Sequence, residues 1–214
     1  MTDRRSIESA FPLKQTSLDS VHEKNVRHGH ISTLHIWPAW RPLAACRAAL
    51  LATLLPDPET AAERRALCET IGGTVRQVVR KTKDGEALAE ETVGGILHWK
   101  REQENVAVLA QFRQRIRAAF GGRAPKVLDP FAGGGAIPLE AMRLGCEVTA
   151  ADLNPVAWFI LKPVGWGDAG TPTSFPTMKC WGSFLTPTYE LRTLRTHSGK
   201  CSIPAASDKL RSSI

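Results

Sequence analysis

The sequence predicts an α/β fold in which a short, incomplete parallel sheet follows a helical N-terminal region. Three observations predict it: an apolar run ending in glycines over 126–135, a helical pattern over 136–144, and a second apolar run ending in an acid over 146–152. This order of strand, helix and strand is typical of parallel sheets, whose strands are joined by crossover helices. The 214 residues are enough for one domain with a sizeable core, and 43% hydrophobic content is ordinary for a globular protein.

Residues 1–120 are expected to form the helical N-terminal region. A helix is predicted to begin near Pro42, because proline suits the first turn, where its missing N–H has no helical partner. Charged, helix-like patterns follow over 58–83 and 104–120. In the second pattern, apolar residues recur at helical spacing, so one face should pack on the core. These residues are Val108, Phe112, Ile116 and Ala119.

The second region, 121–162, should begin the parallel sheet. A strand is predicted over 126–130, and the next helix is predicted from Ala136, with Pro138 in its first turn and Gly145 as its stop. The apolar face of this helix should consist of Ile137, Ala141 and Leu144. A second strand then ends at Asp152, and Asn154 and Pro155 are well suited to cap and open a further helix.

The glycines between the first strand and its helix suit a ligand site. Gly133, Gly134 and Gly135 lack Cβ atoms, so the backbone there can take a positive φ and a ligand can approach it closely. Asp152 follows the second strand, at the sheet edge where nucleotide-like ligands bind in open α/β folds. An acid roughly 20 residues past such glycines commonly accepts hydrogen bonds from ribose hydroxyls. The alternative is that the glycines only turn the chain.

Two cofactors compete for this site. The dinucleotide fingerprint G-x-G-x-x-G, or a final alanine, requires a third small residue, and Pro138 stands in its place. NAD is therefore disfavoured. S-adenosylmethionine has no pyrophosphate and needs only the closely approaching glycines and the ribose acid, so this cofactor is favoured.

The stretch "DPFAGGG" over 129–135 resembles the first cofactor motif of amino-directed DNA methyltransferases. Over residues 5–162 the chain also resembles the N-terminal region, of unknown function, of a family of large adenine-specific DNA methylases. Some of that family carry zinc ribbons and some are linked to anti-phage loci. "RHGHISTLHIW", "RPLAACRAAL" and "GGILHW" carry the rest of the resemblance. It implies a Rossmann-like, class I S-adenosylmethionine-dependent fold, DNA as partner, and a role in restriction-modification or anti-phage defence.

The resemblance also implies which residues bind the cofactor. These are Asp129, Phe131, Gly133 and Gly135, with Asp152 on the ribose. In related enzymes a segment ahead of the glycine motif packs beside the methionine end of the cofactor, which implies Trp37 and Arg41. Here the chain departs from its relatives, because W-W-A-R-R-P in that family is W-P-A-W-R-P in this sequence.

No catalytic residue is identified. Amino-methyltransferases hold the flipped base with the tetrapeptide [DNS]-P-P-[YFW], which this sequence does not contain. The nearest tetrapeptides begin at Asp129, Asn154 and Thr186, and none has the double proline followed by an aromatic residue. The chain is therefore expected to be inactive alone.

Residues 163–214 are expected to form a disordered tail, because scattered Pro, Ser and Thr replace any sustained apolar period. A truncated gene with an out-of-frame tail is the simplest interpretation, and a lineage-specific tail is the alternative.

Two further functional hypotheses remain open. One is a non-catalytic nucleic-acid-binding or assembly module that needs a partner subunit, and the other is an enzyme acting on RNA or a small molecule.

The net charge of +7 and pI of 9.4 favour a polyanionic partner. Arg113, Arg115 and Arg117 are candidates for phosphate contacts, although a solvated helix face is the commoner explanation of such a pattern. Five scattered cysteines without a CxxC pair indicate reduced thiols, and the absence of a leader or membrane segment predicts a cytoplasmic protein. No metal is expected: no carboxylate or paired cysteine completes a ligand set with His28, His30 and His35.

Overall fold

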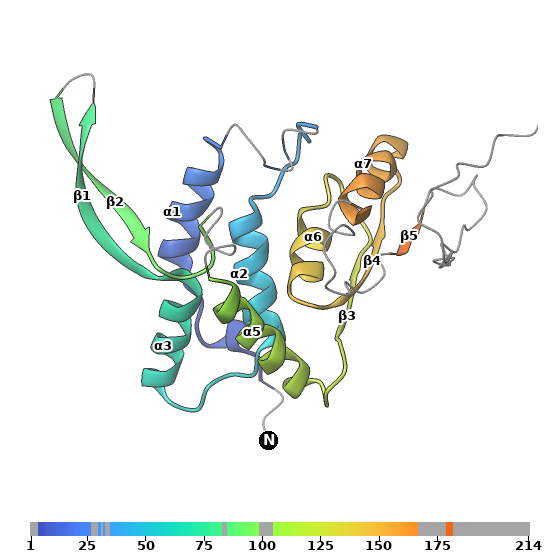
Figure 1. The fold of residues 1–214 in the computed structure, drawn as a ribbon, viewed down its shortest axis with the longest axis horizontal. Helices are drawn as coiled ribbons and strands as arrows, with labels where there is room; N and C mark the ends of the chain where they lie inside the picture. The colour runs from blue at the N-terminus through green and yellow to red at the C-terminus, as the bar shows by residue number, and fades with distance from the viewer. Residues whose placement is uncertain are drawn as a thin grey trace, which may run out of the picture.

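The computed structural model describes residues 4–26, 30, 32, 35–82, 85–98, 105–166 and 179–181. It is a mixed α/β structure with one two-stranded antiparallel sheet and one three-stranded parallel sheet (Figure 1). The elements in chain order are η1 (Ser6–Glu8), α1 (Leu13–Glu23), α2 (Leu43–Leu54), α3 (Ala61–Gly72), β1 (Thr74–Thr82), β2 (Gly85–Val93), α5 (Val106–Ala119), β3 (Lys126–Asp129), α6 (Ala136–Arg143), β4 (Glu147–Ala151), α7 (Pro155–Trp166) and β5 (Lys179–Trp181).

Two helices of the N-terminal region agree with the sequence prediction. Helix α2 begins directly after Pro42, and α5 covers the second predicted pattern. On α5, Phe112 and Ile116 are almost fully buried, while Val108 packs against the core from its margin. The helical spacing of these residues therefore identified the packed face.

The region before residue 120 is not all helical, because residues 74–93 form the antiparallel hairpin β1–β2. A helix was predicted across 58–83, but α3 ends at Gly72 and the chain turns at Gly73, where φ is 77°. The β-branched residues that follow pair across the hairpin, for example Val75 with Thr92. Arg76 and Glu91 form a cross-strand ion pair of 2.8 Å. The hairpin projects from the helices (Figure 1).

The predicted strand, helix and strand of the parallel sheet are confirmed. Strand β3 pairs with β4 in parallel, with Val127 opposite Val148. Helix α6 buries Ala141 and Leu144 as expected, but Ile137 is 37% exposed. Helix α6 lies between α2 and the sheet, so most of its residues are buried and Ile137 occupies the remaining open side.

Asn154 caps α7 as predicted, because its Oδ1 accepts a hydrogen bond of 2.9 Å from the N–H of Val156. Helix α7 continues to Trp166, and β5 adds a third parallel strand beside β4. Residues 163–166 and 179–181 of the predicted tail thus belong to regular elements. The other residues of that tail lie outside the described part of the chain.

One hydrophobic core joins the N-terminal helices to the sheet. It contains residues from α2, α3, α5, α6 and β4. Inside it, Arg47 of α2 donates to Glu140 of α6 through Nε (2.6 Å) and Nη2 (3.0 Å), and both side chains are almost fully buried. Arg143 donates to the same carboxylate at 2.8 Å, and Arg47 also donates to the carbonyl of Ile96. This buried network fixes α6, and the glycine turn before it, against α2.

No helix among the described residues is long and apolar enough to cross a membrane.

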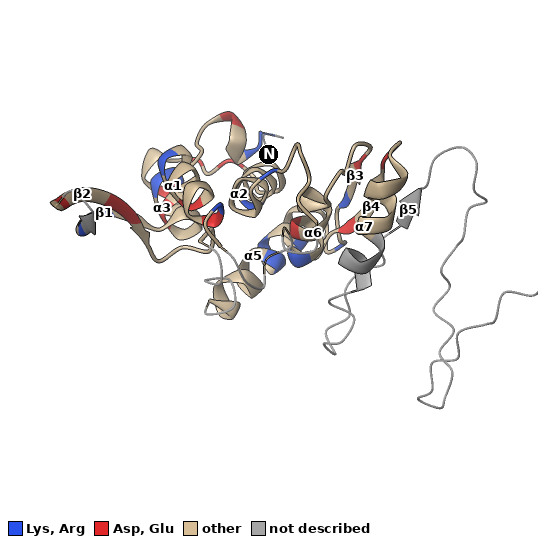
Figure 2. Cartoon of the chain, turned by 90° about the horizontal axis from the view of Figure 1, so that it is seen from above, with Lys and Arg blue, Asp and Glu red and all other residues tan. Residues whose placement is uncertain are grey.

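Basic side chains gather where α5 passes the end of α6 (Figure 2). There the Nε of Arg113 donates to the carbonyl of Arg143 at 2.6 Å, and burial, followed by the nearby charge of Arg117, lowers the pKa of Arg113.

Candidate functional site

The glycine turn and Asp152 meet at the carboxyl edge of the parallel sheet. The N–H of Gly133 donates to Oδ2 of Asp152 at 2.8 Å, and the N–H of Asn154 donates to Oδ1 at 2.8 Å. Gly133 and Gly135 have φ values of 52° and 82°, in the left-handed region that glycine tolerates best. Asp152 therefore holds the turn in place, and each of its oxygens keeps lone pairs for a ligand.

Asp129 lies at the same edge, at the end of β3. Its Oδ1 accepts a hydrogen bond of 3.2 Å from the N–H of Phe131. Burial raises the pKa of Asp129, the Phe131 N–H opposes this shift, and the negative charge of Asp152 adds to it. The structure thus brings two carboxyl groups together beside the glycine turn.

Trp37 packs directly on the glycine turn. A Cβ atom added to Gly133 would lie 2.7 Å from the indole Nε1 of Trp37, and one added to Gly134 would lie 3.1 Å from the Trp37 Cβ. A side chain at Gly133 would therefore collide with Trp37, and one at Gly134 would require Trp37 to shift by a few tenths of an ångström. In this structure the group that lies close to these glycines is the side chain of Trp37.

The other two residues implied by the resemblance are oriented differently. The guanidinium of Arg41 donates to the carbonyl of Ala39 at 3.2 Å, and its side chain is exposed. Phe131 is 76% exposed. Both belong to segments that lie at the glycine turn, but each side chain extends toward solvent.

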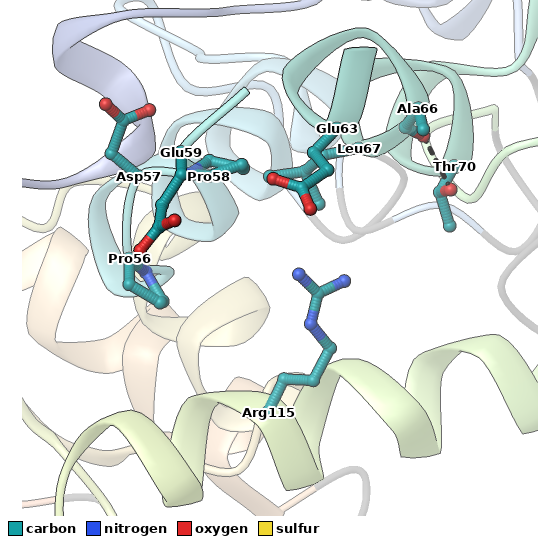
Figure 3. A pocket seen from close by; sticks show the side chains of 9 residues that line it. All are labelled: Pro56, Asp57, Pro58, Glu59, Glu63, Ala66, Leu67, Thr70 and Arg115. Atoms are coloured by element: carbon teal, nitrogen blue, oxygen red, sulfur yellow. Dashed lines mark hydrogen bonds between the residues drawn. The ribbon is translucent and has the colours of Figure 1, made fainter. Parts of the chain in front are cut away.

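The arginines of α5 lie away from this edge. Arg113 contacts the C-terminal end of α6, whereas the glycine turn comes just before the N-terminal end of that helix. The eight residues of α6 therefore place Arg113 about 12 Å from the glycine turn. Arg115 lines a separate cavity of about 490 Å³ between α3 and α5, where its guanidinium faces the carboxylates of Glu59 and Glu63 (Figure 3).

The cysteine side chains in the described part of the chain have raised pKa values, which disfavours the thiolate form. Cys46, Cys68 and Cys146 are free thiols. Burial raises the pKa of Cys46 to about 12 and that of Cys146 to about 11, so both remain protonated at neutral pH. The side chains of Cys180 and Cys201 lie outside the described part.

Sequence reasoning missed Glu23, which is buried under the start of α2. Its carboxylate accepts hydrogen bonds from the N–H groups of Leu43 (2.8 Å) and Ala44 (3.0 Å) and lies 2.7 Å from Nε2 of His30. His30 thus forms a buried hydrogen bond, while His28 lies outside the described residues. A glutamate at the end of a charged helix looks like an exposed residue in the sequence. Its burial becomes visible only through its contact with Leu43, which lies 20 residues further along the chain.

Comparison with known families matches residues 10–70 to DUF1156, a family described as a protein of unknown function. The matched segment covers less than a third of the chain. It spans α1, α2 and most of α3, including Glu23 and Trp37, and ends before the glycine turn. The search of curated proteins found no match.

Proposed function

We propose that this chain is the cofactor-binding N-terminal portion of an S-adenosylmethionine-dependent DNA amino-methyltransferase, specific for adenine and inactive alone. One observation carries the proposal: Asp152, at the end of β4, meets the glycine turn at the edge where Rossmann-like sheets bind nucleoside ligands. Bound there, S-adenosylmethionine would supply an electrophilic methyl group on a sulfonium.

The charge at this edge favours S-adenosylmethionine over NAD. The N–H of Gly133 is already paired with the carboxylate of Asp152, and Asp129 places a second carboxyl group nearby. A pyrophosphate brought to this turn would find the Gly133 N–H already occupied and the Asp129 carboxyl group nearby, whereas the sulfonium and ammonium groups of S-adenosylmethionine do not need that donor. The residues present therefore fit a cationic nucleoside better than a dinucleotide.

DNA as the substrate rests on the resemblance of residues 129–135 to amino-methyltransferases and on the net charge of +7. The arginines of α5 add little specific support for DNA binding, since Arg113 is half-buried and Arg115 faces acidic residues. Any DNA binding by this chain should depend on phosphate contacts and fall steeply with salt.

The chain alone is expected not to methylate DNA. Effective molarity arises from holding both reactants in near-attack geometry, and the sequence has no [DNS]-P-P-[YFW] segment to hold the flipped base. The test incubates purified chain with tritiated cofactor and mixed-sequence DNA, beside an active adenine methyltransferase as positive control. Methyl incorporation by this chain would reveal a catalytic residue set that we have not identified.

A second candidate function is an assembly module that acts only with a partner subunit. Parallel sheets are normally covered on both faces, yet Leu128 in β3 is 67% exposed. Phe131 just after β3, Leu153 just after β4 and Phe159 in α7 are also at least 70% exposed. Apolar exposure of this kind marks interaction surfaces. Turnover that arises only on addition of another subunit would favour this second function.

A further inference from the structure

We propose that Glu23 is a positioning residue that holds Trp37 on the glycine turn, and that Trp37 forms one wall of the ligand site. The ligand part of this inference rests on the proposed binding of S-adenosylmethionine. The positioning part rests on contacts within the protein alone.

Glu23 joins the two ends of the segment that carries Trp37. At one end its Oε1 accepts from Nε2 of His30, and at the other its two oxygens accept from the N–H groups of Leu43 and Ala44. Glu23 is only 3% exposed. Charge-assisted hydrogen bonds in such a buried setting are strong and hard to replace, so the separation of the two ends is fixed by one carboxylate.

The tautomer of His30 follows from its other contacts. The N–H of Ser32 donates to Nδ1 of His30 at 3.1 Å, and the Ser32 Oγ lies 2.8 Å from the same atom, an arrangement that suits Nδ1 as an acceptor. The ring proton then lies on Nε2 and is donated to Glu23. The His30 ring also packs edge-on against Trp40, with ring centroids 5.5 Å apart. The two ring nitrogens of His30 thus connect the start of the segment to Glu23 on one side and to Ser32 on the other.

Trp37 depends on this arrangement because it lies between the two fixed ends. Its indole meets Gly133 at a distance that leaves no room for a Cβ atom, and it packs against the margin of the core. A ligand approaching the turn must therefore stack beside the indole or displace it. Changing the separation of His30 and Leu43 should move the indole and alter the ligand site.

A simpler role for Glu23 is that of a distant cap for the first turn of α2. That role would affect only the stability of the fold, as the loss of an ordinary cap does. It would leave Trp37 and ligand affinity unchanged. Thr60→Ala is the matched control, because Thr60 caps α3 with an accepted hydrogen bond of 3.2 Å from Glu63.

The test substitutes Glu23→Gln, which keeps the shape but turns an NH2 group toward a backbone or ring donor. Acrylamide quenching of tryptophan fluorescence is measured for each variant with and without the additional substitution Trp37→Phe. The difference between the two measurements is the contribution of Trp37. We expect Trp37 to become at least twofold more accessible in Glu23→Gln and unchanged in Thr60→Ala. Affinity for S-adenosylmethionine should fall roughly two- to tenfold when Glu23→Gln is made in the otherwise unchanged chain. In a chain that already carries Trp37→Ala, adding Glu23→Gln should cause no further loss of affinity.

Unchanged quenching of Trp37 in Glu23→Gln would overturn the positioning role, as would independent, additive effects of the Glu23 and Trp37 substitutions. Should Glu23→Gln fail to fold, His30→Ala removes one end of the connection and must give the same change in quenching. A change in Trp37 quenching without S-adenosylmethionine binding by any variant supports the positioning role and refutes the proposed function.

Discussion

Replacing Glu140 by alanine is expected to lower the free energy of unfolding by about 3 to 5 kcal/mol, the cost of leaving a buried charge without its partner. The carboxylate is fully buried and accepts from both Arg47 and Arg143. Its loss would leave the Arg47 guanidinium inside the core that joins α2 to α6. Chemical denaturation followed by circular dichroism measures the change, provided that the slope of the transition is unchanged.

A double replacement separates the ion pair from simple packing. Arg47→Met with Glu140→Leu removes both buried charges and retains similar volume, so it should be considerably less damaging than Glu140→Ala. Equal losses in the single and double variants would contradict the account of an uncompensated charge.

Acid provides an independent measure of the same pair. Burial alone would raise the pKa of Glu140, but the charges of Arg47 and Arg143 outweigh it and hold this pKa below its ordinary 4.5. The stabilisation is therefore complete above pH 4.5 and is lost as the pH falls below that value through the pKa of the folded state. Glu140→Gln should lack this part of the acid sensitivity.

Replacing Asp152 by alanine is expected to weaken S-adenosylmethionine binding by about 1.5 to 3 kcal/mol, or roughly 10- to 150-fold. The carboxylate is placed at the sheet edge to accept ribose hydroxyls, and it also holds the N–H of Gly133. Both losses weaken binding, so the substitution alone does not identify the ribose contact.

A cofactor analogue without ribose hydroxyls identifies that contact. The intact chain should bind the 2′,3′-dideoxy analogue more weakly than the natural ligand, because Asp152 loses its partners. In Asp152→Ala the two ligands should bind equally. If the analogue loses the same affinity in both proteins, Asp152 serves only to hold the glycine turn.

The sheet unit could be predicted because its signals are local. Glycines at the turn, Pro138 in the first helical turn and Asn154 as a cap each act within a few residues, and the structure has each element where those signals place it. The placement of Asp152 at the sheet edge followed from the order of the strands. The contact between Asp152 and Gly133 is then a consequence of parallel pairing.

Features that depend on distant contacts could not be predicted in this way. The first strand of the hairpin, residues 74–82, was mistaken for helix because its charged residues suit either structure, and cross-strand pairs such as Arg76 and Glu91 decide between them. The sequence pair Asp84-Gly85 is a signal for a hairpin near this point, although in the observed register Gly85 already lies in β2 opposite Thr82. The buried pair of Arg47 and Glu140 joins residues 93 positions apart and leaves no local pattern.

Titration calorimetry of the purified chain with S-adenosylmethionine and with NAD tests the central claim most directly. The occupied N–H of Gly133 and the missing third small residue at Pro138 both oppose a pyrophosphate, whereas Asp152 could accept the ribose of either cofactor. We predict saturable binding of S-adenosylmethionine at one site per chain and no measurable binding of NAD. Binding of NAD without binding of S-adenosylmethionine would contradict the proposed function.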